Sequence, residues 1–158
     1  PISGKIDYDI DGRLAGNWFR EGTQGYSGIN RFQYWEGHLT IAYNSLDPTK
    51  IYISMGNWEG KSTQAAVKGN APDPKDVSVQ TGLVKYELIG TQYRYPNGEL
   101  WNQETFVKNV RLDSANSYLI GTLLAQLIDQ RKLKVEIFPN KSASEISGFT
   151  VNAMMYER

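Results

Sequence analysis

Gly16-Asn17-Trp18-Phe19 opens the first long strand-like stretch in this chain of 158 residues. Glycine has no Cβ, so another part of the chain can approach its backbone closely. The tryptophan two positions later carries a large apolar ring that is most stable inside a packed interior. These four residues therefore mark the point at which the first strand of a sheet enters its core.

Alternation of apolar and polar residues with a period of two is the main pattern along the chain. Large apolar residues share one face in 39–43 and again in 51–55. The Asn, Asp and Pro residues of 44–50 predict a hairpin loop between these two strands. The same alternation predicts a half-exposed strand over 132–138.

Further strands are expected at 77–88 and, last in the chain, at 149–155, where Phe, Val, Ala and Met alternate with polar residues. The stretch 114–131 suits either a strand or a helix, because it is rich in Leu, Ala, Gln and Ile. We favour a long strand that turns at 129–131, since Gly121 inside a helix costs about 1 kcal/mol relative to alanine.

The tetrad at residues 16–19 resembles the signature of lipocalins and related calycin barrels. The resemblance implies that Gly16 lets the backbone enter a barrel closely and that Trp18 plugs its closed end. In that family a basic side chain from near the C-terminus covers the tryptophan ring. Arg158 is the comparable residue on the expected last strand, and Arg13 and Arg20 lie near the tryptophan in sequence.

Length, pattern and resemblance together predict one all-β domain over residues 1–158, built as a single antiparallel up-and-down β-barrel. Closure of a barrel removes the exposed edges that an open sheet would leave. The alternative is a jelly-roll β-sandwich. Pairing between the first and last strands distinguishes the two.

The charge balance argues against several classes of partner. Lys plus Arg and Asp plus Glu both number 17, so the chain has no excess positive charge for nucleic acid or an anionic membrane. No cysteine is present, which excludes disulfides and thiolate chemistry. No apolar run reaches the ~18 residues of a membrane span. We expect no cofactor, and the first residue, Pro1, favours a secreted or periplasmic origin without fixing the compartment.

Five residues are candidates for ligand contact. Trp35 and Trp58 lie in glycine-rich stretches, where aromatic rings bind apolar ligands or sugars, or else pack at a barrel mouth. If every connection is a hairpin, both lie on the rim opposite Trp18. Tyr43 and Tyr86 lie on strands, and His38, the only histidine, lies at the start of one.

An Asp-x-Asp-x-Asp-Gly sequence formed by Asp7, Asp9 and Asp11 resembles the opening of a calcium loop, because alternate carboxylates can converge on one cation. The position of the bidentate glutamate is occupied by Trp18, however. A turn at Asp11-Gly12 is the competing interpretation, and we expect no other metal site.

These observations favour a non-enzymatic barrel that binds a small, partly apolar ligand in its interior. One alternative is a small β-barrel enzyme of isomerase or cyclase type, which would use Glu87, Glu104, Tyr43 and Tyr86 as acid–base groups. Another alternative is an accessory domain that acts through an exposed apolar surface. We expect the protein to be a monomer or a homodimer.

Overall fold

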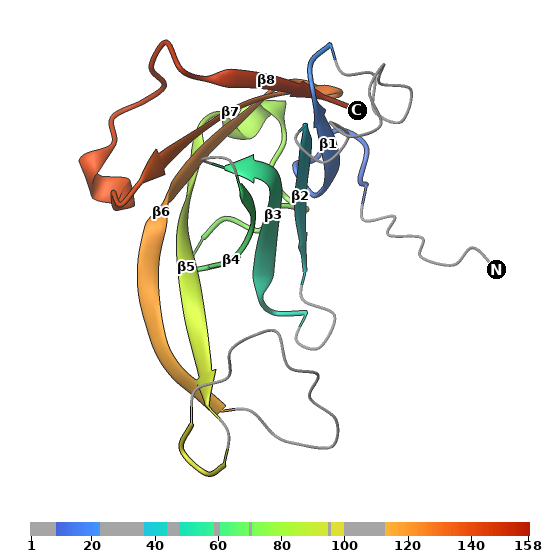
Figure 1. Cartoon of the computed structure of the whole chain (residues 1–158). Coiled ribbons are helices and arrows are strands. Elements are labelled where there is room, and N and C mark those ends of the chain that lie inside the picture. Colours follow the sequence, from blue (N-terminus) through green and yellow to red (C-terminus); the bar gives the residue numbers. More distant parts are fainter. Residues whose placement is uncertain are drawn as a thin grey trace, which may run out of the picture.

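The computed structural model describes residues 9–22, 37–43, 48–58, 61–69, 71–94, 96–99 and 113–158 (Figure 1). Within these ranges the chain forms eight strands and two short 3₁₀ helices. The strands are β1 (Gly16–Arg20), β2 (His38–Tyr43), β3 (Ile51–Trp58), β4 (Lys61–Val67), β5 (Val84–Arg94), β6 (Asp113–Asp129), β7 (Lys132–Pro139) and β8 (Met154–Glu157). The 3₁₀ helices are η3 (Val79–Thr81) and η4 (Ala143–Glu145).

The strands close into one antiparallel barrel in chain order. Each strand pairs with the next, and β1 also pairs with β8, with Phe19 opposite Glu157 and Arg20 opposite Tyr156. Because the first and last strands pair, the predicted up-and-down barrel is confirmed and the jelly-roll alternative is wrong.

Side chains that alternate along the strands fill the barrel interior. In β2, Leu39 and Ile41 are buried inside, whereas His38 and Thr40, which alternate with them, are only partly buried. The core takes side chains from all of the strands and from the segments before β1 and before β5. Its largest fully buried members are Trp18, Tyr86, Leu14, Leu39, Ile41, Ile53, Leu88, Leu123, Leu127 and Leu133.

The ambiguous stretch before residue 131 is a strand, as predicted. β6 pairs with both β5 and β7, and the backbone N–H of Arg131 donates to Asp129 Oδ1 (2.7 Å) in the turn that follows. Leu123 faces the core, and its neighbour Leu124 is buried as well. A strand buried on both faces reads as a continuous apolar run, which explains its likeness to a buried helix.

Two strand boundaries differ from the predictions. β5 begins at Val84 rather than at residue 77, because Val77 packs into the core and the next residues form η3, with a reciprocal capping box between Ser78 and Thr81. β8 begins at Met154 rather than at residue 149, because Thr150 is bonded instead to the buried carboxylate of Glu136 on β7. In both places local hydrogen bonds replace the expected ladder.

The barrel has two distinct ends. The closed end is formed by residues 9–15, the segment 71–83, the β6–β7 turn and Arg158. The pocket end lies where β3 meets β4 and where β7 stops. β5 pairs with β4 at only two register positions but with β6 along its whole length, so β5 and β6 run on together past the other strands (Figure 1). None of the described helices has the length and apolarity to cross a membrane.

Candidate functional site

Trp18 fills the core toward the closed end. Its side chain is fully buried, and its indole Nε1–H donates to the carbonyl oxygen of Leu14 (2.9 Å). The backbone N–H of Leu14 donates in turn to the carbonyl oxygen of Val77 (3.1 Å), which joins the segment before β1 to the segment before β5. This end of the interior is therefore occupied by side chains of the protein itself.

Arg158 covers the tryptophan ring. Its guanidinium carbon lies 4.1 Å from the centroid of Trp18, within the range of a cation–π contact. The guanidinium also donates to the carbonyl oxygens of Ala15 (3.0 Å), Ile10 (2.6 Å) and Arg13 (2.7 Å). The structure thus brings together the tryptophan and the C-terminal arginine that the sequence resemblance paired.

Gly16 lies against the same group. Its φ of 137° is rare for a residue with a side chain. A Cβ at this position would collide with Asp9 Oδ1 and would lie 2.8 Å from Arg158 Nη1. The glycine is therefore required by both its backbone conformation and its close neighbours.

Two carboxylates of the calcium-like sequence also lie at the closed end. Asp9 Oδ1 accepts the backbone N–H of Asn17 (2.6 Å). Burial lowers the pKa of Arg158, whereas the charges of Asp9 and Asp11 act in the opposite direction and favour its charged form. Asp7 lies outside the described residues, and no group of three or more His, Cys, Asp or Glu side chains converges among those that are described. The turn expected at Asp11-Gly12 is present.

Tyr43 and Tyr86 bind the segment 71–77, which crosses the closed end. The hydroxyl of Tyr43 donates to Asp73 Oδ1 and accepts the backbone N–H of Lys75 (3.2 Å). The hydroxyl of Tyr86 donates to the carbonyl oxygen of Pro72 (2.8 Å). Both hydroxyls are therefore engaged in contacts within the protein, away from the pocket end.

These contacts alter the acidity of the groups involved. Burial, followed by the hydrogen bond to Asp73, raises the pKa of Tyr43 to about 12. Burial also raises the pKa of Tyr86. Burial alone would raise the pKa of Asp73. The hydrogen bonds from Tyr43 and Lys75 outweigh this effect, so the pKa of Asp73 is lowered. These pKa shifts favour neutral side chains for Tyr43 and Tyr86 and an ionised carboxylate for Asp73.

His38 lies on the outer side of the barrel wall, because it alternates with the buried Leu39. Its Nε2 lies 2.8 Å from Thr40 Oγ1 and 3.4 Å from Asn17 Oδ1, and its ring centroid lies 5.7 Å from that of Phe19. Partial burial lowers the pKa of His38. This position separates it from the other candidate ligand residues.

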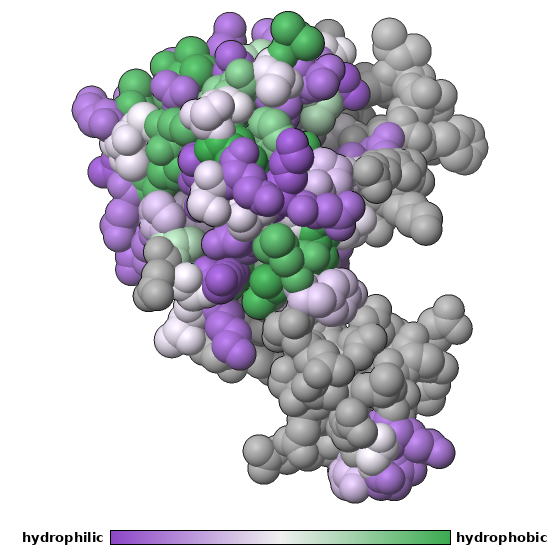
Figure 2. Space-filling model, turned by 90° about the vertical axis from the view of Figure 1, so that its left-hand side faces the viewer, coloured by the Kyte–Doolittle hydropathy of each residue, from purple (hydrophilic) through white to green (hydrophobic). Residues whose placement is uncertain are grey.

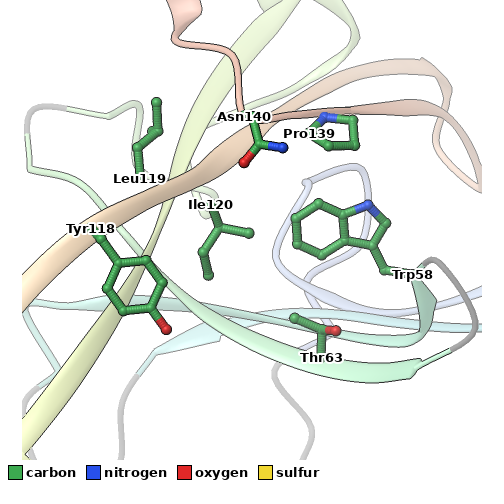
Figure 3. A pocket seen from close by; sticks show the side chains of 7 residues that line it. All are labelled: Trp58, Thr63, Tyr118, Leu119, Ile120, Pro139 and Asn140. Carbon is green, nitrogen blue, oxygen red and sulfur yellow. The ribbon is translucent and has the colours of Figure 1, made fainter.

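A pocket of about 390 Å³ lies at the pocket end (Figure 3). Trp58 at the end of β3 forms one side of it, and Tyr118 on β6 lies across from the indole. The full lining is Trp58, Thr63, Tyr118, Leu119, Ile120, Pro139 and Asn140. Alternating strand directions place this pocket at the end of the barrel opposite the Trp18–Arg158 contact.

Breaks in strand register create the pocket. The pairing of β3 with β4 shifts between Met55 and Trp58, and that of β5 with β6 shifts where Leu88–Ile89 faces Gly121 and Leu119. The second shift leaves Ile120 as the extra residue of a bulge. A bulge re-aims the side chains around it, and β7 ends beside it at Pro139. Side chains from four strands therefore converge where regular pairing stops.

The lining is aromatic and aliphatic with two polar groups. Trp58 and Ile120 pack against the core, whereas Tyr118 (53% exposed) and Leu119 (38% exposed) form the accessible side. Thr63 and Asn140 supply a hydroxyl and an amide. Among the described residues, none of those lining the pocket carries a charge.

Of the ligand-contact residues predicted from sequence, the structure places only Trp58 in this pocket. Trp35 and Glu104 lie outside the described residues. Glu87 lies between the buried Tyr86 and Leu88 and so faces outward. The remaining lining residues had not been predicted, because a bulge leaves no mark in an apolar strand such as 118–120.

The outer face of β6, β7 and the segment 140–153 bears on the accessory-domain alternative (Figure 2). Hydrophobic residues form several small groups on this face, and hydrophilic residues separate them. Among the described residues visible in this view, the hydrophobic groups do not join into one continuous apolar surface (Figure 2).

Comparison of the chain with protein-family models, with curated proteins and with solved structures gave no match. The functional argument therefore rests on the pocket and its surroundings.

Proposed function

We propose that this protein is a non-enzymatic, lipocalin-like binding barrel that holds a small, partly apolar molecule at its pocket end. The observation that carries the proposal is the position of Trp58 in a pocket of about 390 Å³ that combines aromatic and aliphatic side chains with polar groups. Pockets for small molecules in proteins generally measure about 300 to 1,000 Å³ and are lined mainly by apolar and aromatic side chains with a few polar groups.

The filled closed end supports this location for the ligand. A barrel of about eight strands has room either for its own side chains or for one small ligand. Here Trp18, Tyr86 and their buried neighbours occupy the interior toward the closed end. A ligand would therefore enter only as far as Trp58 and Ile120, and would sit in the mouth rather than deep in the barrel.

Two features support the lipocalin-like part of the proposal. The barrel has eight antiparallel strands in up-and-down order. The first strand carries Trp18 beneath an arginine that directly follows the last strand. The barrel and the arginine over Trp18 are the two features that the resemblance of Gly16–Phe19 to the lipocalin signature implies.

Titration with fatty acids, retinoids and porphyrins tests the proposal, with each class offered both as the carboxylate and in an uncharged form, such as retinol beside retinoic acid and a fatty amide beside a fatty acid. We expect at least one probe class to change the tryptophan fluorescence of the intact protein. Trp58→Ala should then weaken binding of that probe by about 10-fold or more, because loss of a large buried ring contact costs roughly 1.5–3 kcal/mol. Calorimetry should measure the affinities, since the substitution also removes a fluorophore.

Val151→Ala provides a matched control, because Val151 is fully exposed and does not line the pocket. Its affinity for the same probe should equal that of the unaltered protein. The proposal would be contradicted if no probe changed the tryptophan fluorescence. It would also be contradicted if Trp58→Ala bound the probe as tightly as the unaltered protein.

A further inference from the structure

Asn140 has an unusual backbone conformation at the edge of the pocket. Its φ is 60°, the only positive value among the described residues other than glycine. Asparagine tolerates this left-handed region better than most residues, but the conformation still needs support from its surroundings. The support is a hydrogen bond from the backbone N–H of Asn140 to the carbonyl oxygen of Ile120 (2.8 Å). The residue is therefore anchored directly to the β6 bulge.

This anchoring directs the side chain into the pocket. In Figure 3 the amide of Asn140 points from the end of β7 toward the space between Ile120 and Trp58. No hydrogen bond to this amide occurs within the described part of the chain. Asn140 is exposed, so its N–H₂ donors and its carbonyl acceptor are accessible to a ligand at the edge of the pocket.

The remaining lining argues against an anionic ligand. No charged side chain lines the pocket among the described residues. Asn140, Tyr118 and Leu119 are exposed, so a ligand would lose only part of its hydration, but partial burial of a carboxylate without a cation is still unfavourable. The face of an indole ring also carries negative potential that repels an anion. An ionised carboxylate on the ligand has no hydrogen to donate, so the side-chain oxygen of Asn140 would form no hydrogen bond with it.

We propose that Asn140 makes the pocket selective for uncharged ring compounds that carry an amide-like pair of donor and acceptor. The ring lies against Trp58, and the polar edge bonds to both halves of the Asn140 amide. This inference rests on the proposed function of the pocket and adds the chemical class of its ligand.

A matched pair of probes tests the selectivity. 1-Naphthylacetamide and 1-naphthylacetate share the same ring, and they differ in that one ends in an amide and the other in a carboxylate. Binding to ¹⁵N-labelled full-length protein should be followed at the Trp58 indole N–H and the Asn140 side-chain amide. We expect the amide probe to bind about 10-fold more tightly than the carboxylate probe.

Asn140→Gly separates ligand recognition from folding. Glycine adopts a φ of 60° without steric cost, so the variant should keep or raise the unfolding temperature. It should nevertheless bind 1-naphthylacetamide about 5- to 10-fold more weakly, because the side-chain hydrogen bonds are lost. Asn140→Asp keeps the side-chain shape and tolerates the same backbone, but it replaces the donor with a negative charge. It should weaken both probes, the carboxylate more than the amide.

The outcomes separate this inference from the proposed function. If both probes shift the Trp58 signal with equal affinity, or if Asn140→Gly binds the amide probe as tightly as the unaltered protein, the pocket binds ligands but Asn140 does not select them. Tighter binding of the carboxylate probe would also overturn the inference. If neither probe shifts the Trp58 signal, the inference is rejected together with the proposal that the pocket binds small ring compounds.

Discussion

Among single residues, Arg158 is expected to contribute strongly to stability. Its guanidinium stacks on Trp18 and satisfies three backbone carbonyl groups. Arg158→Ala should lower the free energy of unfolding by about 2–4 kcal/mol, since each such charged hydrogen bond and a partly buried cation–π contact contribute roughly 1–3 kcal/mol and are not additive. Urea denaturation at neutral pH measures this change.

Arg158→Lys should recover part of the loss, because lysine keeps the charge but lacks the planar fork that reaches several acceptors. Lys132→Ala, at an exposed position of β7, should remain within about 0.5 kcal/mol of the unaltered protein. Equal stability of Arg158→Ala and Lys132→Ala would show that the contact with Trp18 contributes nothing.

The aspartates near this arginine show that a sequence pattern does not reveal which positive group the carboxylates contact in the fold. Alternate carboxylates at 7, 9 and 11 suit a bound cation. In the folded chain a guanidinium from the other end of the sequence lies near two of them. Spacing alone could identify the negative charge, but it could not show that Arg158, far along the chain, comes close to it.

Among the structural elements, the segment 71–77 should become less stable at alkaline pH, because Tyr43 and Tyr86 hold it through their hydroxyl groups. Tyr43 has a folded-state pKa of about 12, above its value of about 10 in an unfolded chain. A raised pKa means that the stabilising contribution is complete below pH 10 and is lost as the pH rises from 10 to about 12. The lowered pKa of Asp73 acts at the other extreme, because its contribution exists above about pH 4 and is lost on further acidification.

Tyr43→Phe should therefore lower the free energy of unfolding by about 1 kcal/mol at pH 7 and weaken its decrease between pH 10 and 12. Some alkaline dependence should persist, because the pKa of Tyr86 is also raised. Denaturation at pH 7, 10 and 11.5 measures both effects. Tyr118→Phe removes the hydroxyl of a partly exposed tyrosine at the other end of the barrel and is the control at pH 7. A Tyr43→Phe profile identical to that of the unaltered protein would contradict the assigned contact.

β6 shows which properties of an element can be read from sequence. The glycine in its apolar run correctly favoured a strand over a helix, and the aspartate at its end correctly marked the turn into β7. The bulge at Ile120 was not predicted, since it depends on how β5 pairs with β6 after both strands have formed. The pocket lies at this unpredicted irregularity.

For the whole molecule, closure of the barrel depends on the short strand β8, which pairs with both β1 and β7. Deletion of residues 154–158 should expose two strand edges, and exposed edges promote association between chains. We expect the shortened protein to lose its cooperative thermal transition and to form larger species in light scattering.

Arg158→Ala separates closure from the loss of the arginine, because this variant keeps β8 intact. It should unfold cooperatively, at a lower midpoint, and keep the molecular mass of the unaltered protein. If the shortened chain also kept both the mass and the cooperative transition, pairing of β8 would be dispensable for the fold.

The sequence by itself determined the all-β class, the up-and-down order of the strands and the burial of Trp18 on the first of them, because these follow from local alternation, turn residues and one short signature. Tertiary structure decided the rest. It turned Tyr43 and Tyr86 from candidate ligand residues into anchors for the segment 71–77, and it placed His38 on the outer wall. It also assembled the pocket from Trp58 on β3, Ile120 on β6 and Asn140, which directly follows β7. Side-chain periodicity is a property of each strand alone, whereas a site at a register break depends on how several strands pair.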